Sequence, residues 1–386
     1  MHTGTFLHKL LVNVTHKKRI ITLTLAIDAA LIFKQLSVTK LGRALRLRIQ
    51  ERSCIRRADR LIGNKKLFKE RKAIYGKVTK LLVNTKTKPT IIVDWSSVPN
   101  SEYNNLRAAL VTKGRALTLY EEVHPIKRLG NQKVQNNFLK TMKELLPAGC
   151  KPIIVTDAGF HNGWFKEVIR LGWDYVGRIR SGKIYRFANS DEWERVDDLC
   201  KTYSGGLRSF GKIELSRQNS LFGYLYVTKE KVKKRLRSKR ELKKGDRSVR
   251  NHRIAAKEAW VLVSSLFGYG VDKKVIAIYK KRMQIEESFR DLKSSRYGFG
   301  FEYSYSKYIA RIEILLLIAM LASTIAWLVG LAAERMNLHY NFQVNSVKNR
   351  RVLSLFFLGC QVIRRKIRIP IEALKESIRE IHYEAI

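Results

Sequence analysis

The chain of 386 residues predicts a mixed α/β fold, on three observations. The first is a change near residue 90, where helical spacing of apolar residues gives way to apolar β-branched runs. The second is a pair of such runs, residues 90–96 and 152–159, each containing an aspartate after its apolar residues. The third is the order of elements over residues 90–180: three strands, a helix, a strand, a helix and a strand.

Short helices are expected before residue 90. Thr39 is placed to cap a helix over residues 40–47 and Ser53 one over residues 54–62, because hydroxyls accept backbone N–H groups at a helix start. The second helix is strongly basic, with the three arginines Arg56, Arg57 and Arg60. Two interpretations stay open: a helix-turn-helix-like DNA-binding module, or a solvated helical bundle with basic faces.

Two aspartates follow the apolar residues of predicted strands. Asp94 closes the first run and Asp157 the second, and both runs are apolar enough to be buried on both faces. The remaining elements are a hairpin over residues 105–111 and 116–123, helices over 131–146 and 163–171, and a strand over 173–180. The two carboxylates are therefore expected at one edge of the sheet.

This order of elements stops after residue 180. Short aromatic segments at residues 221–227 and 259–266 indicate strands. Between them, residues 229–253 hold 13 Lys and Arg against 3 acidic residues, without apolar periodicity. Such a run is either a solvated loop or an arm that contacts phosphates.

The net charge of the chain limits the kinds of molecule that it can bind as a partner. Lys and Arg number 76 against 33 Asp and Glu, a formal net charge of +43, while 45% of the residues are hydrophobic. This excludes an ordinary neutral enzyme acting on a small molecule, because a folded protein so charged needs a polyanion or an anionic membrane as partner. Four scattered cysteines argue against a zinc ribbon or a disulfide scaffold and fit a reducing compartment.

One apolar segment, residues 314–333, is long enough to span a bilayer. It is flanked by Arg311 and Glu313 on one side and by Glu334 and Arg335 on the other, so the cationic asymmetry typical of a membrane span is missing. We expect a helix buried against a sheet, with a membrane-crossing helix as the alternative.

A helical pattern over residues 273–293 gathers polar side chains on one face. At about 100° per residue, a sector of roughly 60° holds four of them: Tyr279, Arg282, Glu286 and Lys293. The face is either an ordinary salt-bridged surface or part of a site with Asp94 and Asp157. Three clustered carboxylates require cations between them, and their hard oxygens favour Mg²⁺ or Mn²⁺. Two ions about 4 Å apart promote phosphoryl transfer on DNA.

Three motifs carry a resemblance to a known family: Ile-Val-Asp94-Trp-Ser, Ile-Val-Thr-Asp157-Ala-Gly-Phe and Tyr279-x2-Arg282-x3-Glu286-x6-Lys293. They match the DDE transposases of bacterial insertion sequences, in insertion-sequence family four, and the chain looks close to the Tn-ten type over nearly its whole length. The Tyr-Arg-Glu-Lys spacing is highly specific, whereas three isolated acidic residues would not be.

The resemblance implies an RNase H-like catalytic core, a mixed sheet with helices, interrupted by a mostly β insertion. The implied segments are an all-α DNA-binding domain at 1–85, the first part of the core at 86–180, the β-rich insertion with its basic loop at 181–270, the second part of the core at 271–335, and a C-terminal helical region for DNA contact or dimerisation at 336–386.

The resemblance also implies roles for single residues. The catalytic metal ligands would be Asp94, Asp157 and Glu286, holding two Mg²⁺ or Mn²⁺ ions. The phosphates of the transposon end would be contacted by Tyr279, Arg282 and Lys293. Trp260 would stack on a flipped base, with a buried core tryptophan as the alternative. Met283 stands where a related enzyme has a second tryptophan for base flipping.

The implied reaction is cut and paste. Water cleaves one strand at the element's end, the freed 3′-OH forms a hairpin with the other strand, a second water opens it, and the 3′-OH attacks target DNA. The implied partners are the terminal inverted repeats, target DNA and a second copy of the chain, with no membrane and a cytoplasmic, nucleoid-associated location. The rival hypotheses are a metal-dependent DNA nuclease and a non-catalytic DNA-binding regulator.

Overall fold

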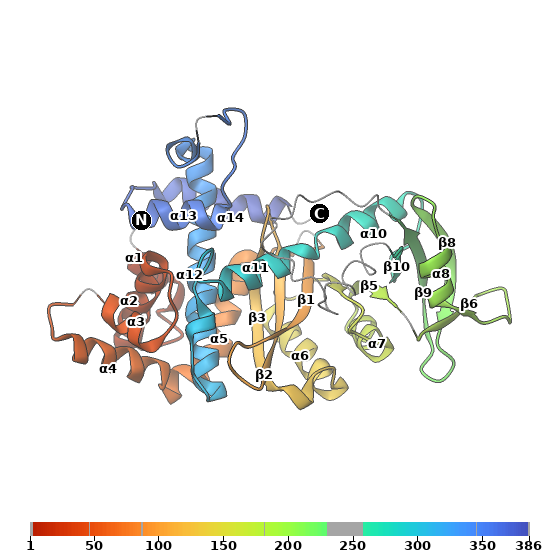
Figure 1. The fold of residues 1–386 in the computed structure, drawn as a ribbon, viewed down its shortest axis with the longest axis horizontal. Coiled ribbons are helices and arrows are strands. Elements are labelled where there is room, and N and C mark those ends of the chain that lie inside the picture. The colour runs from red at the N-terminus through yellow and green to blue at the C-terminus, as the bar shows by residue number, and fades with distance from the viewer. Residues whose placement is uncertain are drawn as a thin grey trace, which may run out of the picture. The chain divides into compact units, whose positions relative to one another are not determined.

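The computed structural model describes residues 3–45, 47–85, 88–180, 182–229, 258–344 and 346–384, which form two compact units (Figure 1). Unit 1 contains Met1–Pro152 and Met283–Ile386, and unit 2 contains Ile153–Arg282. Nearly all of the basic segment 229–253 lies outside the described residues, so both interpretations of that segment stay predictions.

Unit 1 is built on a three-stranded antiparallel sheet. Its strands are β1 (Thr90–Ser97), β2 (Tyr103–Val111) and β3 (Ala116–Pro125), in the order β3-β2-β1, and the predicted hairpin is confirmed. Asp94 pairs with Arg107, and Arg107 pairs with Glu121. Because side chains alternate between the faces of a strand, these three charged residues form one row on one face of the sheet.

The position of Asp94 within its strand differs from the expectation. Trp95, Ser96 and Ser97 continue β1 and stay paired with residues 104–106 of β2. Asp94 therefore lies inside a strand rather than at its end, since polar residues after it still find backbone partners in the ladder.

The residues described before the sheet form helices, as the sequence predicts, although two of these helices, of 17 and 18 residues, are longer than the short ones expected. The helices are α1 (Thr3–Leu11), α2 (Lys17–Phe33), α3 (Val38–Ala44), α4 (Glu51–Ile62) and α5 (Lys65–Leu82). The predicted caps are wrong: Ser37, not Thr39, accepts the N–H of Lys40 at the start of α3, and α4 begins before Ser53, at Glu51. The glycine after α4, Gly63, is its C-cap.

Helices cover both faces of the unit 1 sheet. On one face Tyr75 of α5 packs edge-on against Tyr120, which also contacts Phe138 of α6 (Gln132–Leu145). Asn131 caps α6 by accepting the N–H of residue 134, and this helix confirms the predicted one. On the other face lies α11 (Met283–Lys293), where Phe289 packs under the guanidinium of Arg107.

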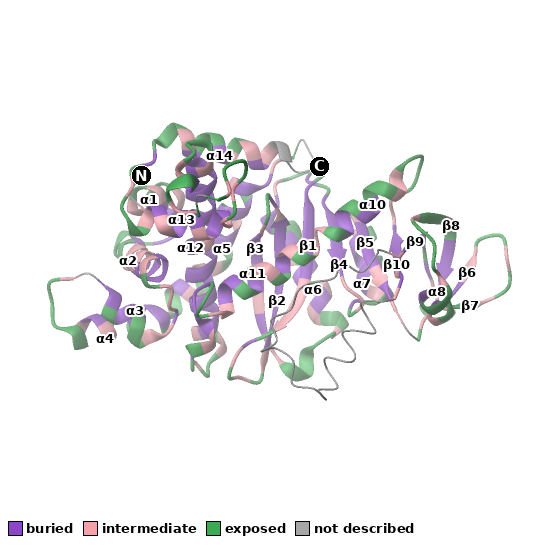
Figure 2. Ribbon diagram, turned by 45° about the horizontal axis from the view of Figure 1, so that its top comes forward, coloured by how far each residue is buried: buried purple, intermediate pink, exposed green. Residues whose placement is uncertain are grey.

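A long apolar helix, α12 (Ile309–Arg335), forms the centre of unit 1. Its apolar window has a mean hydropathy of 2.5 and is 94% buried inside the protein, as the purple ribbon in Figure 2 shows. It packs against α2, α5, β3 and the last two helices, α13 (Leu355–Arg364) and α14 (Ile371–Glu384). The helix is long enough to cross a membrane, but its surface is covered as in a core helix. The absence of a membrane partner stays a prediction.

Close backbone contact joins α12 to α13. A Cβ added to Gly330 would lie 1.9 Å from the carbonyl oxygen of Leu355, and one added to Gly359 would lie 1.8 Å from that of Ala326. Only glycine fits at these two positions, because any side chain would push the helices apart.

Unit 2 contains the predicted strand, helix, strand order followed by a mostly β segment. Its elements are β4 (Ile153–Thr156), α7 (Asn162–Arg170), β5 (Asp174–Ile179), β6 (Ile184–Phe187), β7 (Glu194–Arg195), α8 (Val196–Thr202), β8 (Arg208–Leu215), β9 (Leu221–Thr228), β10 (Trp260–Ser264) and α10 (Val271–Lys280). The strand order is β4-β5-β10-β9-β8-β6-β7, with β4 and β5 parallel and the other pairs antiparallel. The strands predicted near residues 221 and 259 are confirmed.

The continuous helix expected over residues 273–293 is wrong. The chain forms α10, a turn at Lys281 and Arg282, and then α11. The N–H groups of both turn residues bond to carbonyls three positions earlier, which tightens the end of α10. The four polar side chains therefore do not share the face of one helix, and the 100° spacing does not apply across the break.

Candidate active site

The unit 1 part of the site lies on the second half of β1. Asp94 is half-buried, and its Oδ1 accepts the N–H of Trp95 at 2.8 Å. Lys293, the last residue of α11, donates from Nζ to the Ser96 Oγ at 2.8 Å. Glu286 lies exposed in the first turn of α11, seven residues and about two helical turns before Lys293, so both point from the same side of the helix.

The surroundings of Lys293 lower the pKa of its ammonium group. Burial and the nearby Arg107 lower the pKa of Lys293 to about 8, while Asp94 opposes this shift. An anion placed beside Lys293 would raise its pKa again, because an opposite charge favours the protonated ammonium. The position is thus suited to receive a negatively charged group.

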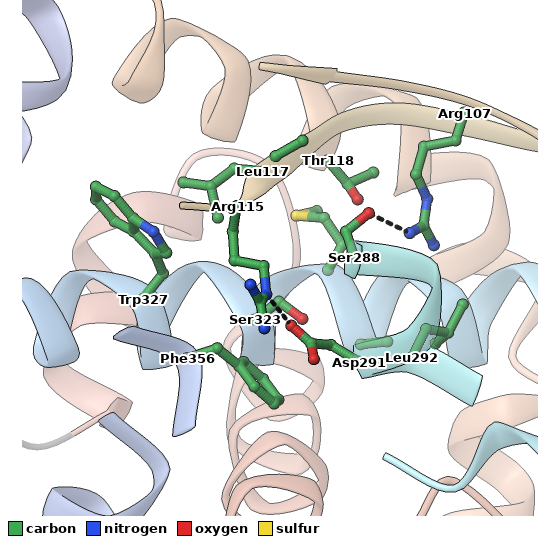
Figure 3. Close-up of a pocket in the computed structure, with 13 residues that line it drawn as sticks. Arg107, Arg115, Leu117, Thr118, Ser288, Asp291, Leu292, Ser323, Trp327 and Phe356 are labelled. Carbon is green, nitrogen blue, oxygen red and sulfur yellow. Dashed lines mark hydrogen bonds and ion pairs between the residues drawn. The ribbon is translucent and has the colours of Figure 1, made fainter. Parts of the chain in front are cut away.

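A buried ion pair anchors α11 to the sheet. Arg107 and Glu121 are 4% and 1% exposed at their side chains, and a guanidinium nitrogen lies 2.7 Å from the carboxylate. Glu121 also accepts from Asn105 at 2.6 Å and from the Tyr75 hydroxyl at 3.2 Å. Arg107 in turn donates to the Ser288 Oγ on α11 at 3.4 Å (Figure 3). The pair therefore links the strand beside Asp94 to the helix that carries Glu286.

A second contact holds the later part of α11. Arg115 donates to the buried carboxylate of Asp291 at 2.6 Å, beside a small cavity lined by Trp327 and Phe356 (Figure 3). Burial raises the pKa of Asp291, although Arg115 counteracts the shift. These anchors were not expected from the sequence. The available signal was the presence of Arg107 and charged neighbours inside otherwise apolar strands.

The unit 2 part of the site begins with Asp157. This residue follows β4 directly, as expected, and is half-buried. Its Oδ1 accepts the N–H of Gly159 at 2.9 Å, and a Cβ on Gly159 would lie 3.1 Å from the same oxygen. The glycine thus allows the turn to close against the carboxylate.

Tyr279 differs from the expected exposed phenol. It is only 3% exposed and packs edge-on against Trp260, with ring centroids 5.1 Å apart. Burial raises the pKa of Tyr279, while Arg282 and Arg178 oppose the shift. Trp260 is half-buried, so one part of its ring stays accessible. Its T-shaped packing on Tyr279 holds the indole in place.

Arg178 was not singled out from the sequence. Its guanidinium is buried beside Tyr279, and burial lowers the pKa of Arg178. Within the described part of the chain, its Nε and Nη2 atoms have no hydrogen-bond partner, although Glu258 lies 3.7 Å away. The Nε–H group can donate to an anionic oxygen without breaking a hydrogen bond to a described residue, and Nη2 can do so at the cost of only its long contact with Glu258.

The remaining predicted DNA-contacting residues are spread over both units. Arg282 is half-buried in the turn after α10, and Met283 is 43% exposed at the start of α11. On α4, Arg56 and Arg60 are exposed, whereas Arg57 donates to Thr22 inside unit 1. The exposed pair therefore remains available to phosphates.

The predicted metal ligands are divided between the units. Unit 1 carries Asp94 and Glu286, and unit 2 carries Asp157. Over the ranges that the structure describes, no group of three His, Cys, Asp or Glu residues is placed to hold a metal ion. The donor chemistry nevertheless suits one, because three carboxylates offer the hard oxygens that Mg²⁺ and Mn²⁺ prefer.

Comparison with protein families gives a match over most of the chain. Residues 85–325 match the family model described as "Transposase DDE domain". This range runs from just before β1 into α12 and includes every residue of the predicted carboxylate set. No curated protein matches the chain.

Proposed function

The chain belongs to the DDE transposase family, because the matching model covers well over half of it, and from that premise we propose a cut-and-paste enzyme of an insertion sequence. Its mixed α/β fold is consistent with an RNase H-like domain. The proposed substrate is the pair of terminal inverted repeats of its own element. The proposed products are 3′-OH ends, released through a hairpin intermediate and joined to target DNA. Membership of insertion-sequence family four, close to the Tn-ten type, is part of the proposal.

The observation that best supports this proposal is that Lys293 lies close enough to Asp94, on the second half of β1, for the carboxylate to raise its pKa. A carboxylate there supplies oxygen ligands, and an ammonium within reach of Ser96 can bind a phosphate oxygen. The carboxylate on the strand and the ammonium at the end of the helix together suit a phosphodiester, because the ammonium can bind its phosphate oxygens. The buried Arg107 keeps these two elements in register.

We assign Asp94, Asp157 and Glu286 as the residues that would hold two Mg²⁺ or Mn²⁺ ions. Such ions, when bound, activate a nucleophilic oxygen and stabilise the leaving 3′ oxygen. Lys293 and Arg282 bind phosphate oxygens and orient the strand. Arg178, with two donors still unbonded to described residues, is a further phosphate ligand in unit 2.

The grip on DNA is proposed to extend beyond the carboxylates. Arg56 and Arg60 on α4 contact duplex phosphates of the transposon end. Trp260 stacks on a base that leaves the helix, and Met283 helps to push it out. Two copies of the chain hold two ends in a synaptic dimer, in the cytoplasm at the nucleoid.

The decisive test replaces each carboxylate while keeping its shape. We expect Asp94→Asn, Asp157→Asn and Glu286→Gln each to lower Mg²⁺-dependent cleavage of the end by at least about a hundredfold, while end binding in gel shifts stays within about twofold. Two exposed acids serve as controls, since Asp191→Asn and Glu372→Gln remove carboxylates whose side chains are 105% and 77% exposed. Unchanged cleavage in all three site variants would refute the assignment.

Strand joining separates the proposal from its rivals. A transposase joins the cleaved 3′ end to a target plasmid, whereas a metal-dependent nuclease with the same site only cuts. A non-catalytic regulator would bind the end and repress without either product. Recovery of cut ends that never join target DNA would favour the nuclease.

A further inference from the structure

The segment after α11 exposes an unusual number of aromatic rings. Residues 294–308, called the tyrosine loop below, connect α11 to α12 and carry Tyr297, Tyr303, Tyr305 and Tyr308. Their exposed fractions are 50%, 51%, 72% and 73% in that order. Exposed rings gathered in one short segment mark a binding surface more often than a packing accident.

The tyrosine loop is held rigidly. Phe299 and Phe301 are buried, and Gly298 packs so tightly on α11 that a Cβ would lie 1.6 Å from the carbonyl oxygen of Asp291. The Ser295 N–H donates to the Glu302 carboxylate at 2.7 Å. The tyrosines are therefore displayed by a fixed backbone, which reduces the entropy lost when a ligand binds.

The loop lies beside the unit 1 part of the candidate site. The Asn100 side chain donates to the Glu302 carbonyl at 2.6 Å, and the Tyr103 hydroxyl donates to the Lys307 carbonyl at 3.1 Å. Asn100 belongs to the turn between β1 and β2, and Tyr103 is the first residue of β2. Lys293 contacts this same end of β1. Lys293 and the tyrosine loop therefore both contact the region where β1 ends and β2 begins.

The charges around the rings favour an anionic partner. Arg290, which also pairs with Glu287, and Arg296 lie 5.6 and 5.2 Å from the Tyr297 ring centroid, and Lys307 belongs to the loop itself. The loop's one carboxylate, Glu302, is turned inward to Ser295. A surface that has cations beside exposed aromatic rings suits a nucleotide, because its phosphate pairs with the cations and its base stacks on the rings.

We propose that the tyrosine loop is a stacking platform for unpaired bases of the DNA end. Bases inside an intact duplex are covered by their neighbours, so only bases freed from pairing can stack on these rings. The inference rests on the proposed function and extends it, because strand opening at an element's end produces such bases. The platform selects opened DNA over closed duplex.

The test compares two DNA ends bound by the full chain. One is a blunt duplex, and the other carries three unpaired nucleotides with 2-aminopurine as a fluorescent base. We expect Tyr305→Ala with Tyr308→Ala to weaken binding to the tailed end at least about tenfold and binding to the blunt end less than about twofold. The wild-type chain quenches 2-aminopurine by stacking, and the double variant loses that quenching.

Conservative and matched variants distinguish stacking from other causes. Tyr305→Phe with Tyr308→Phe keeps both rings and is expected to keep tail binding and quenching. Tyr269→Ala removes a fully exposed tyrosine of unit 2 and is expected to change neither. If the alanine variant misfolds, the phenylalanine variant and a Tyr305→Leu variant still test whether stacking binds the tail. Phenylalanine keeps the stacking face, whereas leucine keeps apolar bulk without one.

Several results would overturn the proposal. Equal loss for tailed and blunt ends would show a general contact with DNA. Loss in the phenylalanine variant would show that the hydroxyls matter and stacking does not. Altered self-association in sedimentation, with DNA binding unchanged, would assign the surface to a second copy of the chain. If any of these occurs while Asp94→Asn still abolishes cleavage, the proposed function stands and only the platform falls.

Discussion

Replacing Arg107 by Met should destabilise unit 1 more than any surface ion-pair substitution. The change leaves the buried Glu121 carboxylate with Asn105 and Tyr75 as its side-chain donors among the residues that the structure describes. Removing one partner of a buried ion pair costs about 3–5 kcal/mol, because the remaining charge stays in a medium that solvates it poorly. Arg107→Met with Glu121→Gln removes both charges, and we expect its loss to shrink to about 1–2 kcal/mol.

The assay is urea unfolding followed by both circular dichroism and tryptophan fluorescence. The change in the free energy of unfolding is calculated from the shift in the urea midpoint, with the dependence of that free energy on urea held constant. This requires that the two probes give the same unfolding transition. Lys72→Met is the control, since its partner Glu144 is 62% exposed and such surface pairs contribute less than about 1 kcal/mol. A loss below about 1 kcal/mol for Arg107→Met, or a double variant as unstable as the sum of the single ones, would refute the reasoning.

Three further predictions concern pH, packing and thiol chemistry. Burial raises the pKa of Glu122, but the hydrogen bonds of its carboxylate with His124 and Tyr120 outweigh this effect, so the pKa lies below the usual 4.5. The stabilising contribution of the Glu122 carboxylate is then complete above about pH 4.5 and is lost as the pH falls through the lowered pKa. Glu122→Gln should therefore flatten the fall in Tm between about pH 5 and 3. Tm curves that stay parallel for the variant and the wild type would contradict this. Gly359→Ala should cost about 1–3 kcal/mol in the same urea assay, whereas Gly206→Ala, where a Cβ meets nothing within 4 Å, should cost little; equal losses would contradict the close helix contact. Burial raises the pKa of the Cys360 thiol to about 12, so iodoacetamide at pH 8 should label it at least about a hundredfold more slowly in the native chain than in urea; equal rates, measured by mass spectrometry of the peptide, would contradict its burial.

Local patterns predicted much of the fold. The apolar β-branched runs around Asp94 and Asp157 became β1 and β4, because such residues fit a strand buried on both faces. The helical pattern expected over residues 131–146 became α6, whose first turn is capped by the Asn131 side chain. These features depend on residues close together in sequence, so a single sequence contains the information for them.

Features made by distant contacts could not be predicted in the same way. Nothing in the residues around Lys281 and Arg282 signals a break, since neither glycine nor proline is present there. The burial of Tyr279 depends on Trp260, which comes 19 positions earlier, and the role of Arg107 becomes visible only when its strand pairs with that of Glu121. The candidate site was therefore predicted as a set of carboxylates without the buried groups that support it.

The central position of α12 sets an order of events during synthesis. This helix packs against α2 and α5, which are made early, and against α13 and α14, which are made last. At about 5–20 residues per second, roughly 13–50 seconds separate the completion of α5 from that of α12. Through that interval the first helices lack the surface that covers them in the finished unit. The N-terminal helices of this protein therefore complete their packing only when the last part of the chain has been made.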